Sequence, residues 1–115
     1  MILREPVKFD ELLGVCKFKY YDEMVKAVVD IERELIAVNG HMHADLEEML
    51  LDDESRQQDL WGINLHPDGE EIEFDSLINI RPGQNNRSRG IENPEVAQKV
   101  VEVTKKWIIH SHIPN

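Results

Sequence analysis

The sequence of 115 residues has one cysteine, no long apolar run and few basic residues. The single cysteine excludes an internal disulfide bond. The absence of disulfides is typical of proteins from reducing compartments. No apolar stretch approaches the roughly 20 residues of a membrane-spanning helix. The opening stretch MILREPVKFDELL carries charges where a signal peptide has an apolar segment. We therefore expect a cytoplasmic protein without membrane association, with one domain over residues 1–115 and a frayed tail over residues 109–115.

Basic residues are scarce, with 13 Lys and Arg against 23 Asp and Glu and a net charge of −10. The acids concentrate in residues 44–75, which hold 12 acids and one base, whereas residues 76–115 hold three acids and six bases. Affinity for duplex nucleic acid comes from basic side chains that neutralise phosphates. The composition therefore predicts no duplex nucleic acid partner, and we interpret the acidic middle as a solvated face.

Four segments are predicted strands. Three of them show alternating apolar residues, the pattern of half-buried strands, because successive strand side chains point to opposite faces, and Leu35–Val38 is a short apolar run. The clearest alternation lies in the fourth segment, where Ile72, Phe74 and Ile80 fall on one face. The first two segments, and likewise the last two, are close enough in sequence to form antiparallel hairpins. The four predicted strands are Met24–Ile31, Leu35–Val38, Leu60–His66 and Ile72–Arg81.

Two segments show helical apolar spacing, Val7–Lys19 near the start and Pro94–Ile108 near the end. Asn93 is a predicted N-cap for the second helix, which has a proline in its first turn. Asp45–Glu48 fits a capping box that begins a short acidic helix, with a strand over residues 46–52 as the alternative. We predict an α+β fold in which the N- and C-terminal helices cover one face of an antiparallel sheet of about four strands. The short acidic helix lies between the two hairpins.

Polar side chains gather on one face of the second predicted hairpin and in the arginine-bearing loop, Gly83–Gly90, that follows it. Arginine presents a planar fork of donors for carboxylate or phosphate, and the loop leads to a predicted helix start. This pattern predicts a non-catalytic binding or regulatory module for a small anion, nucleotide-like or carboxylate, or for an acidic partner segment. The alternative is that the arginines pair with the protein's own carboxylates on the wet side of the sheet. The predicted ligand-binding residues are Asn64, Asp75, Asn79, Arg81, Arg87, Ser88 and Arg89.

A second hypothesis is a metal-dependent hydrolase or nuclease. His43, Asp45 and Asp75 would be its ligands, with His66 as an extra ligand or base. The run His41–Asp45 has the order His-x-His-x-Asp of zinc hydrolases, but it lacks the Asp-His pair that completes that motif. No metal is favoured, because a capping role for Asp45 explains the same residue more simply.

A third hypothesis is a structural subunit whose sheet face packs against a partner. An exposed sheet edge or face favours coverage by a second copy, so we expect a homodimer. No cofactor is expected, and the sequence leaves open whether the protein is an enzyme.

Several unusual strings carry a resemblance to a known family. The chain resembles, over nearly its whole length, a small prokaryotic family catalogued as a domain of unknown function. His41 departs from the pattern of that family. The resemblance implies no reaction, ligand or partner. The strings are VKAVVDIE (Val25–Glu32), HAD (His43–Asp45), DLWGIN (Asp59–Asn64), EFDSLINIRP (Glu73–Pro82) and NRSRG (Asn86–Gly90).

Overall fold

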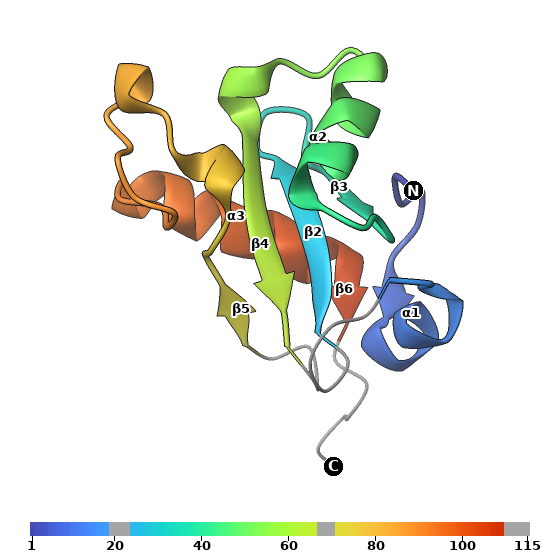
Figure 1. Cartoon of the computed structure of the whole chain (residues 1–115). Helices are drawn as coiled ribbons and strands as arrows, with labels where there is room; N and C mark the ends of the chain where they lie inside the picture. Colours follow the sequence, from blue (N-terminus) through green and yellow to red (C-terminus); the bar gives the residue numbers. More distant parts are fainter. Residues whose placement is uncertain (19–23, 67–70, 110–115) are drawn as a thin grey trace.

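The computed structural model describes residues 1–18, 24–66 and 71–109, and it is built around one antiparallel sheet (Figure 1). The strand order in this sheet is β3-β2-β4-β5, which confirms the predicted α+β class with four strands. Both predicted hairpins are confirmed, since β2 pairs with β3 and β4 pairs with β5, each antiparallel. The strands are β2 (Val25–Asp30), β3 (Leu35–Val38), β4 (Leu60–Leu65) and β5 (Ile72–Glu73).

Helices cover both faces of the sheet (Figure 1). On one face, α1 (Phe9–Val15) and α3 (Pro94–Trp107) pack against alternate residues of β2, β3 and β4 in the larger core, as predicted. On the other face, α2 (His43–Asp52) packs on a smaller core. The buried residues of that smaller core are Val28, Ala37, Leu46, Leu50 and Leu60.

The start of α2 differs from the predicted capping box. The helix begins at His43 with Met42 as its N-cap, three residues before the expected N-cap Asp45. Asp45 is then the third helical residue, and its Oδ2 atom accepts a hydrogen bond of 3.0 Å from the Met42 N–H. The aspartate still caps the helix, but from inside its first turn. The helical alternative for residues 46–52 is correct and the strand alternative is wrong.

The predicted strand Ile72–Arg81 is wrong beyond Glu73. After β5 the chain leaves the sheet and forms a short 3₁₀ helix, η3 (Leu77–Asn79), whose N-cap is Ser76. The Asn79 side chain then takes the place of a strand backbone. Its Oδ1 accepts from the Gly62 N–H at 2.8 Å, and its Nδ2 donates to the Gly62 carbonyl at 3.0 Å. The edge of β4 is thus satisfied by a side chain, which apolar alternation does not reveal.

The first and last elements of the described chain meet in a two-stranded parallel sheet. Within it, β1 (Val7–Lys8) pairs with β6 (Ile108–Ile109), with Val7 opposite Ile108. The predicted first helix is therefore shorter than expected, and Ile109 lies in a strand rather than in a frayed tail. The rest of the predicted tail lies outside the described residues. None of the helices in residues 1–18, 24–66 and 71–109 has the length and apolar character that a bilayer crossing requires.

Candidate functional site

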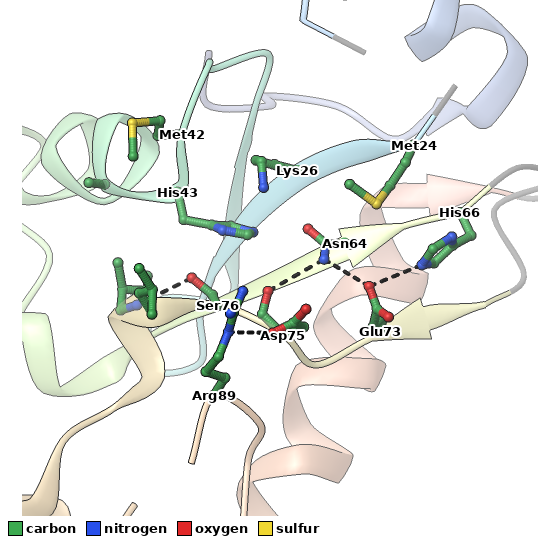
Figure 2. A pocket seen from close by; sticks show the side chains of 13 residues that line it. Met24, Lys26, Met42, His43, Asn64, His66, Glu73, Asp75, Ser76 and Arg89 are labelled. Atoms are coloured by element: carbon green, nitrogen blue, oxygen red, sulfur yellow. Dashed lines mark hydrogen bonds and ion pairs between the residues drawn. The ribbon is translucent and has the colours of Figure 1, made fainter. Parts of the chain in front are cut away.

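A cavity of about 530 Å³ opens on the face of the sheet that carries α2 (Figure 2). Its walls come from β2, the start of α2, β4, β5, η3 and the arginine-bearing loop. The volume is in the range of small-molecule sites. The apolar lining is Met24, Met42, Ala44, Leu77 and Ile78, and the polar lining is Lys26, His43, Asn64, His66, Glu73, Asp75, Ser76 and Arg89.

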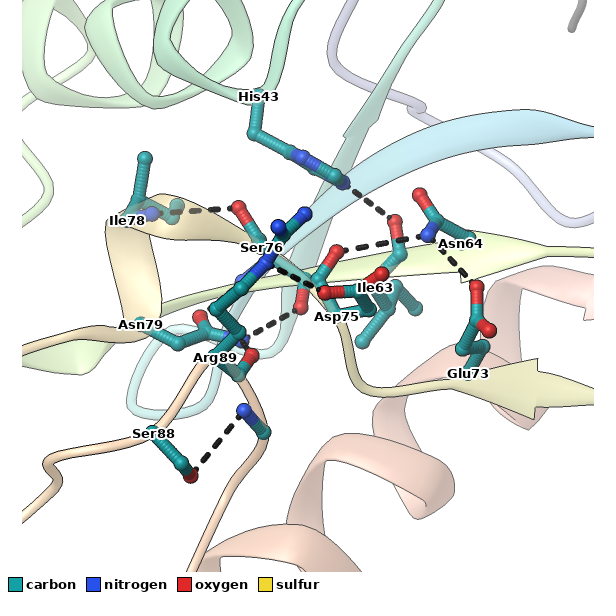
Figure 3. A network of polar contacts seen from close by, with 12 residues as sticks. His43, Ile63, Asn64, Glu73, Asp75, Ser76, Ile78, Asn79, Ser88 and Arg89 are labelled. Atoms are coloured by element: carbon teal, nitrogen blue, oxygen red, sulfur yellow. Dashed lines mark hydrogen bonds and ion pairs between the residues drawn. The ribbon is translucent and has the colours of Figure 1, made fainter.

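Asn64 of β4 lies in the wall of this cavity and is only 4% exposed. Its Nδ2 donates to Glu73 Oε1 at 2.9 Å and to the Asp75 carbonyl at 3.4 Å (Figure 3). A carboxylate only accepts, so this bond fixes which end of the amide is the nitrogen. The Oδ1 atom is buried and has no hydrogen-bond partner within residues 1–18, 24–66 and 71–109. Figure 2 shows it directed toward the space between His43, Lys26 and Met24.

His43, in the first turn of α2, lines the cavity beside Asn64 and is 7% exposed. Its Nε2 lies 2.8 Å from the Ile63 carbonyl. Because a carbonyl only accepts, Nε2 carries the hydrogen, and Nδ1 of the neutral ring is an acceptor. The Asn64 side chain lies close enough to His43 to raise the pKa of the imidazole. No hydrogen bond of normal geometry joins the two side chains.

The imidazole of His43 is held in its neutral form. Burial lowers the pKa of His43, and the nearby charge of Lys26 lowers it further. The Ile63 carbonyl and the Asp75 carboxylate act in the opposite direction, but they do not offset the burial. The cavity therefore contains a neutral ring between charged neighbours.

One ion pair and one contact between a histidine and a carboxylate line the rim of the cavity. Arg89 Nε lies 2.7 Å from Asp75 Oδ1, and His66 Nε2 lies 3.2 Å from Glu73 Oε1. The hydrogen bond from Asn64 lowers the pKa of Glu73, and His66 lowers it further, so this carboxylate is ionised at neutral pH. The contact of 2.7 Å with Asp75 is made by Nε, at the inner end of the Arg89 guanidinium. A guanidinium held by its Nε can present both Nη groups to an anion.

Asn64, Asp75 and Arg89 are thus the three predicted ligand-binding residues that the structure brings together in this cavity. Asn79 is fully buried against β4, where its amide bonds Gly62. These contacts give Asn79 a structural role beneath the cavity.

Arg81 lies apart from the cavity, with its guanidinium 4.2 Å from the Trp61 ring centre. Its side chain donates to the carbonyls of Ile78 at 3.0 Å, of Gln57 at 2.6 Å and of Leu60. Burial lowers the pKa of Arg81. Its fork of donors is therefore largely used by the protein's own backbone, which joins the short helix η1 (Gln57–Asp59) to the end of η3.

Arg87 and Ser88 also lie outside the cavity lining. Their backbone N–H groups donate to Glu92 Oε2 at 2.5 and 2.9 Å, and this holds the loop in shape. Ser88 Oγ accepts from the Gly90 N–H at 3.2 Å. The loop thus positions Arg89 while the Arg87 side chain is exposed.

The sequence-based set of binding residues did not include Lys26, Met24 or Met42. Lys26 lies opposite Asn64 in the register of β2 and β4, so it faces the same side of the sheet. That signal was present, but it required knowing that β4 pairs with β2. Met42 lines the cavity because of how α2 packs on the sheet, and the sequence contains no local signal for that packing.

The alternative metal ligands His43, Asp45 and Asp75 are not brought together. Asp45 bonds the backbone at the start of α2, whereas the other two line the cavity. Within residues 1–18, 24–66 and 71–109, no group of three or more His, Cys, Asp or Glu side chains is placed to hold a metal ion.

A family model described as "Protein of unknown function (DUF5674)" matches residues 1–107. This match confirms the resemblance seen in the sequence motifs. No curated protein and no solved structure matches the chain.

Proposed function

Because the chain belongs to the DUF5674 family, whose description assigns no activity, we propose a function from the cavity itself. The protein is a binding module for a small organic ligand that carries an anionic group. The ligand occupies the cavity between α2, η3 and the sheet, and its anionic group pairs with Arg89.

The observation that carries this proposal is the Asn64 amide. Its Oδ1 is buried, directed into the cavity space and without a partner among the described residues. Native structures rarely leave a buried acceptor unpaired, because this costs about 1–3 kcal/mol. A ligand that donates a hydrogen bond to Oδ1 removes this cost. A purely structural role for the polar face would leave the acceptor unpaired.

The anionic group of the ligand is assigned to Arg89. Its side chain is 57% exposed, yet Asp75 fixes its Nε at 2.7 Å, so the two Nη groups are oriented at the cavity rim. Arg89 is the arginine of the loop that lines the cavity. A guanidinium held in this way binds carboxylate or phosphate with little loss of side-chain entropy.

The test compares two arginine variants of the same loop. We expect wild-type protein to melt several degrees higher with one member of a panel of carboxylates, phosphates and nucleotides. Arg89→Ala should remove that shift, whereas Arg87→Ala, the matched control outside the cavity, should retain it. Both variants should fold, because the contacts of Arg89 with Ser76 N and Asn79 Nδ2 use its backbone carbonyl.

An equal shift in wild type and Arg89→Ala would contradict the assignment of the anionic group. The absence of any shift across the panel would contradict the proposed function and would favour a subunit that packs against a protein partner.

A further inference from the structure

We propose that the ligand is a zwitterion, namely a free amino acid with an apolar side chain. This inference rests on the proposed function and specifies the chemistry of its ligand. Its carboxylate pairs with Arg89, its ammonium group lies at Asn64 and Glu73, and its side chain covers the apolar wall of the cavity.

The first argument is the balance of charge around the cavity. Lys26 and Arg89 supply two positive charges, and Glu73 and Asp75 supply two negative charges. His43 is neutral, and His66 lies against Glu73. A polyanion such as a nucleotide would lie against both carboxylates, and like charges at close range repel. A ligand with one charge of each sign finds an opposite charge for both of its groups.

The second argument is the pair of acceptors on one side of the cavity. Asn64 Nδ2 donates to Glu73 at 2.9 Å, so the side chain whose Oδ1 has no partner among the described residues stands next to an ionised carboxylate. An ammonium group has three donors and a positive charge, which suits an amide oxygen and a carboxylate together. Oδ1 is covered, and the side chains of Lys26 and Met24 flank it in Figure 2, so the ligand reaches Oδ1 only if these two side chains move aside.

The third argument is the exposed apolar surface at the cavity mouth. Met42 and Leu77 are 53% and 65% exposed, and both belong to the lining. Burial of apolar surface is favourable at about 25 cal/mol per Å². Methionine adapts its shape to different partners, so this wall accommodates an aliphatic or aromatic side chain.

The experiment uses calorimetric titration of the full chain with L-leucine, L-methionine and L-phenylalanine. Each amino acid is compared with its des-amino acid and its decarboxylated amine, which for leucine are 4-methylpentanoate and 3-methylbutylamine. We expect at least one amino acid to bind tenfold or more tightly than either of its two analogues. The same panel includes inorganic phosphate and a nucleotide.

A matched variant locates the ammonium group. Glu73→Gln keeps an oxygen that accepts from Asn64 but removes the charge. We expect this variant to bind the amino acid at least tenfold more weakly than wild type does. The des-amino acid should bind as tightly as before or more tightly. Unfolding of this variant in urea shows whether the protein remains folded.

The remaining outcomes separate the inference from the proposed function. The ligand is not a zwitterion if the des-amino acid binds as tightly as its amino acid, or if only phosphate or the nucleotide binds. In either case the proposed anion site at Arg89 still holds. If the amine alone binds as tightly as the amino acid, or if nothing binds, both the inference and the proposed function are wrong. Equal weakening of all ligands by Glu73→Gln would overturn the placement of the ammonium group.

Discussion

His43 is a residue whose protonation the fold resists. Burial keeps its folded pKa below the unfolded value of about 6.5, so the unfolded chain takes up this proton first as the pH falls. Its contribution to stability is therefore fully present above about pH 6.5 and is lost as the pH drops through the folded pKa. We expect the free energy of unfolding to fall more between pH 7 and pH 5 in wild type than in His43→Gln.

Glutamine is the suitable replacement because it keeps an N–H donor for the Ile63 carbonyl and does not titrate. Urea denaturation at both pH values measures the difference. His41 and His66 are present in both proteins, so their direct contributions cancel in the comparison. Equal losses in the two proteins would show that His43 does not couple folding to pH.

Single residues also show where sequence reasoning stops. The motif search found Asn64, Asp75 and Arg89, which line the cavity, because polar residues on one strand face and in a turn-rich loop have a recognisable spacing. The sequence could not show that Arg89 lines the cavity whereas Arg81 does not. An arginine that bonds its own backbone carbonyls has the same local sequence context as one that faces a cavity. Only the three-dimensional arrangement distinguishes them.

At the scale of elements, the contact between β4 and η3 depends on a glycine. A Cβ atom at Gly62 would lie 2.6 Å from Ser76 Cβ and Oγ and 3.1 Å from His43 Cδ2. We expect Gly62→Ala to destabilise the protein by about 1–3 kcal/mol, because the cap of η3 and the start of α2 must both shift. The variant should also bind any ligand of the cavity more weakly than wild type does.

Gly14 provides the matched control. It lies inside α1, and a Cβ atom there would meet no atom within 4 Å. Gly14→Ala should therefore stabilise the protein by roughly 0.5–1 kcal/mol through its higher helix propensity. Urea unfolding of both variants checks the opposite signs. A neutral Gly62→Ala would show that η3 is not packed against β4 as described.

The elements that the sequence predicted well are those fixed by local chemistry. Leu35–Val38 has the predicted bounds, and α3 starts where Asn93 accepts from Glu95 N and Val96 N. The end of β5 could not be predicted, because the chain leaves the sheet to satisfy a buried amide contact with Gly62. The covering of the cavity by α2 depends likewise on packing between distant segments.

At the scale of the whole molecule, the charge of −10 makes the folded state sensitive to salt. Like charges confined to a compact chain repel, and salt screens that repulsion. We expect the melting temperature to rise by a few degrees when NaCl is raised from low to physiological concentration. Ion pairs such as Arg33–Asp53, at 2.9 Å, weaken in salt and oppose the effect, but exposed pairs contribute little.

A charge-neutralised chain is the control for this prediction. Glu48→Gln with Asp52→Asn removes two exposed acids from α2 and should reduce the slope of melting temperature against salt. Thermal melts monitored by circular dichroism give both slopes. A melting temperature that falls with salt would mean that ion pairs, and not net repulsion, dominate the electrostatics.

The pairing of β1 with β6 has a consequence for how the chain folds as it is synthesised. Val7 is synthesised about a hundred residues before its partner Ile108. The core that Phe9 and Leu12 join is likewise incomplete until Val100 and Val103 of α3 appear. Contacts so distant in sequence form slowly, because a long loop must close first. β1 is thus among the last elements to settle, and the hairpin of β2 and β3 can form before the partner of β1 has been synthesised.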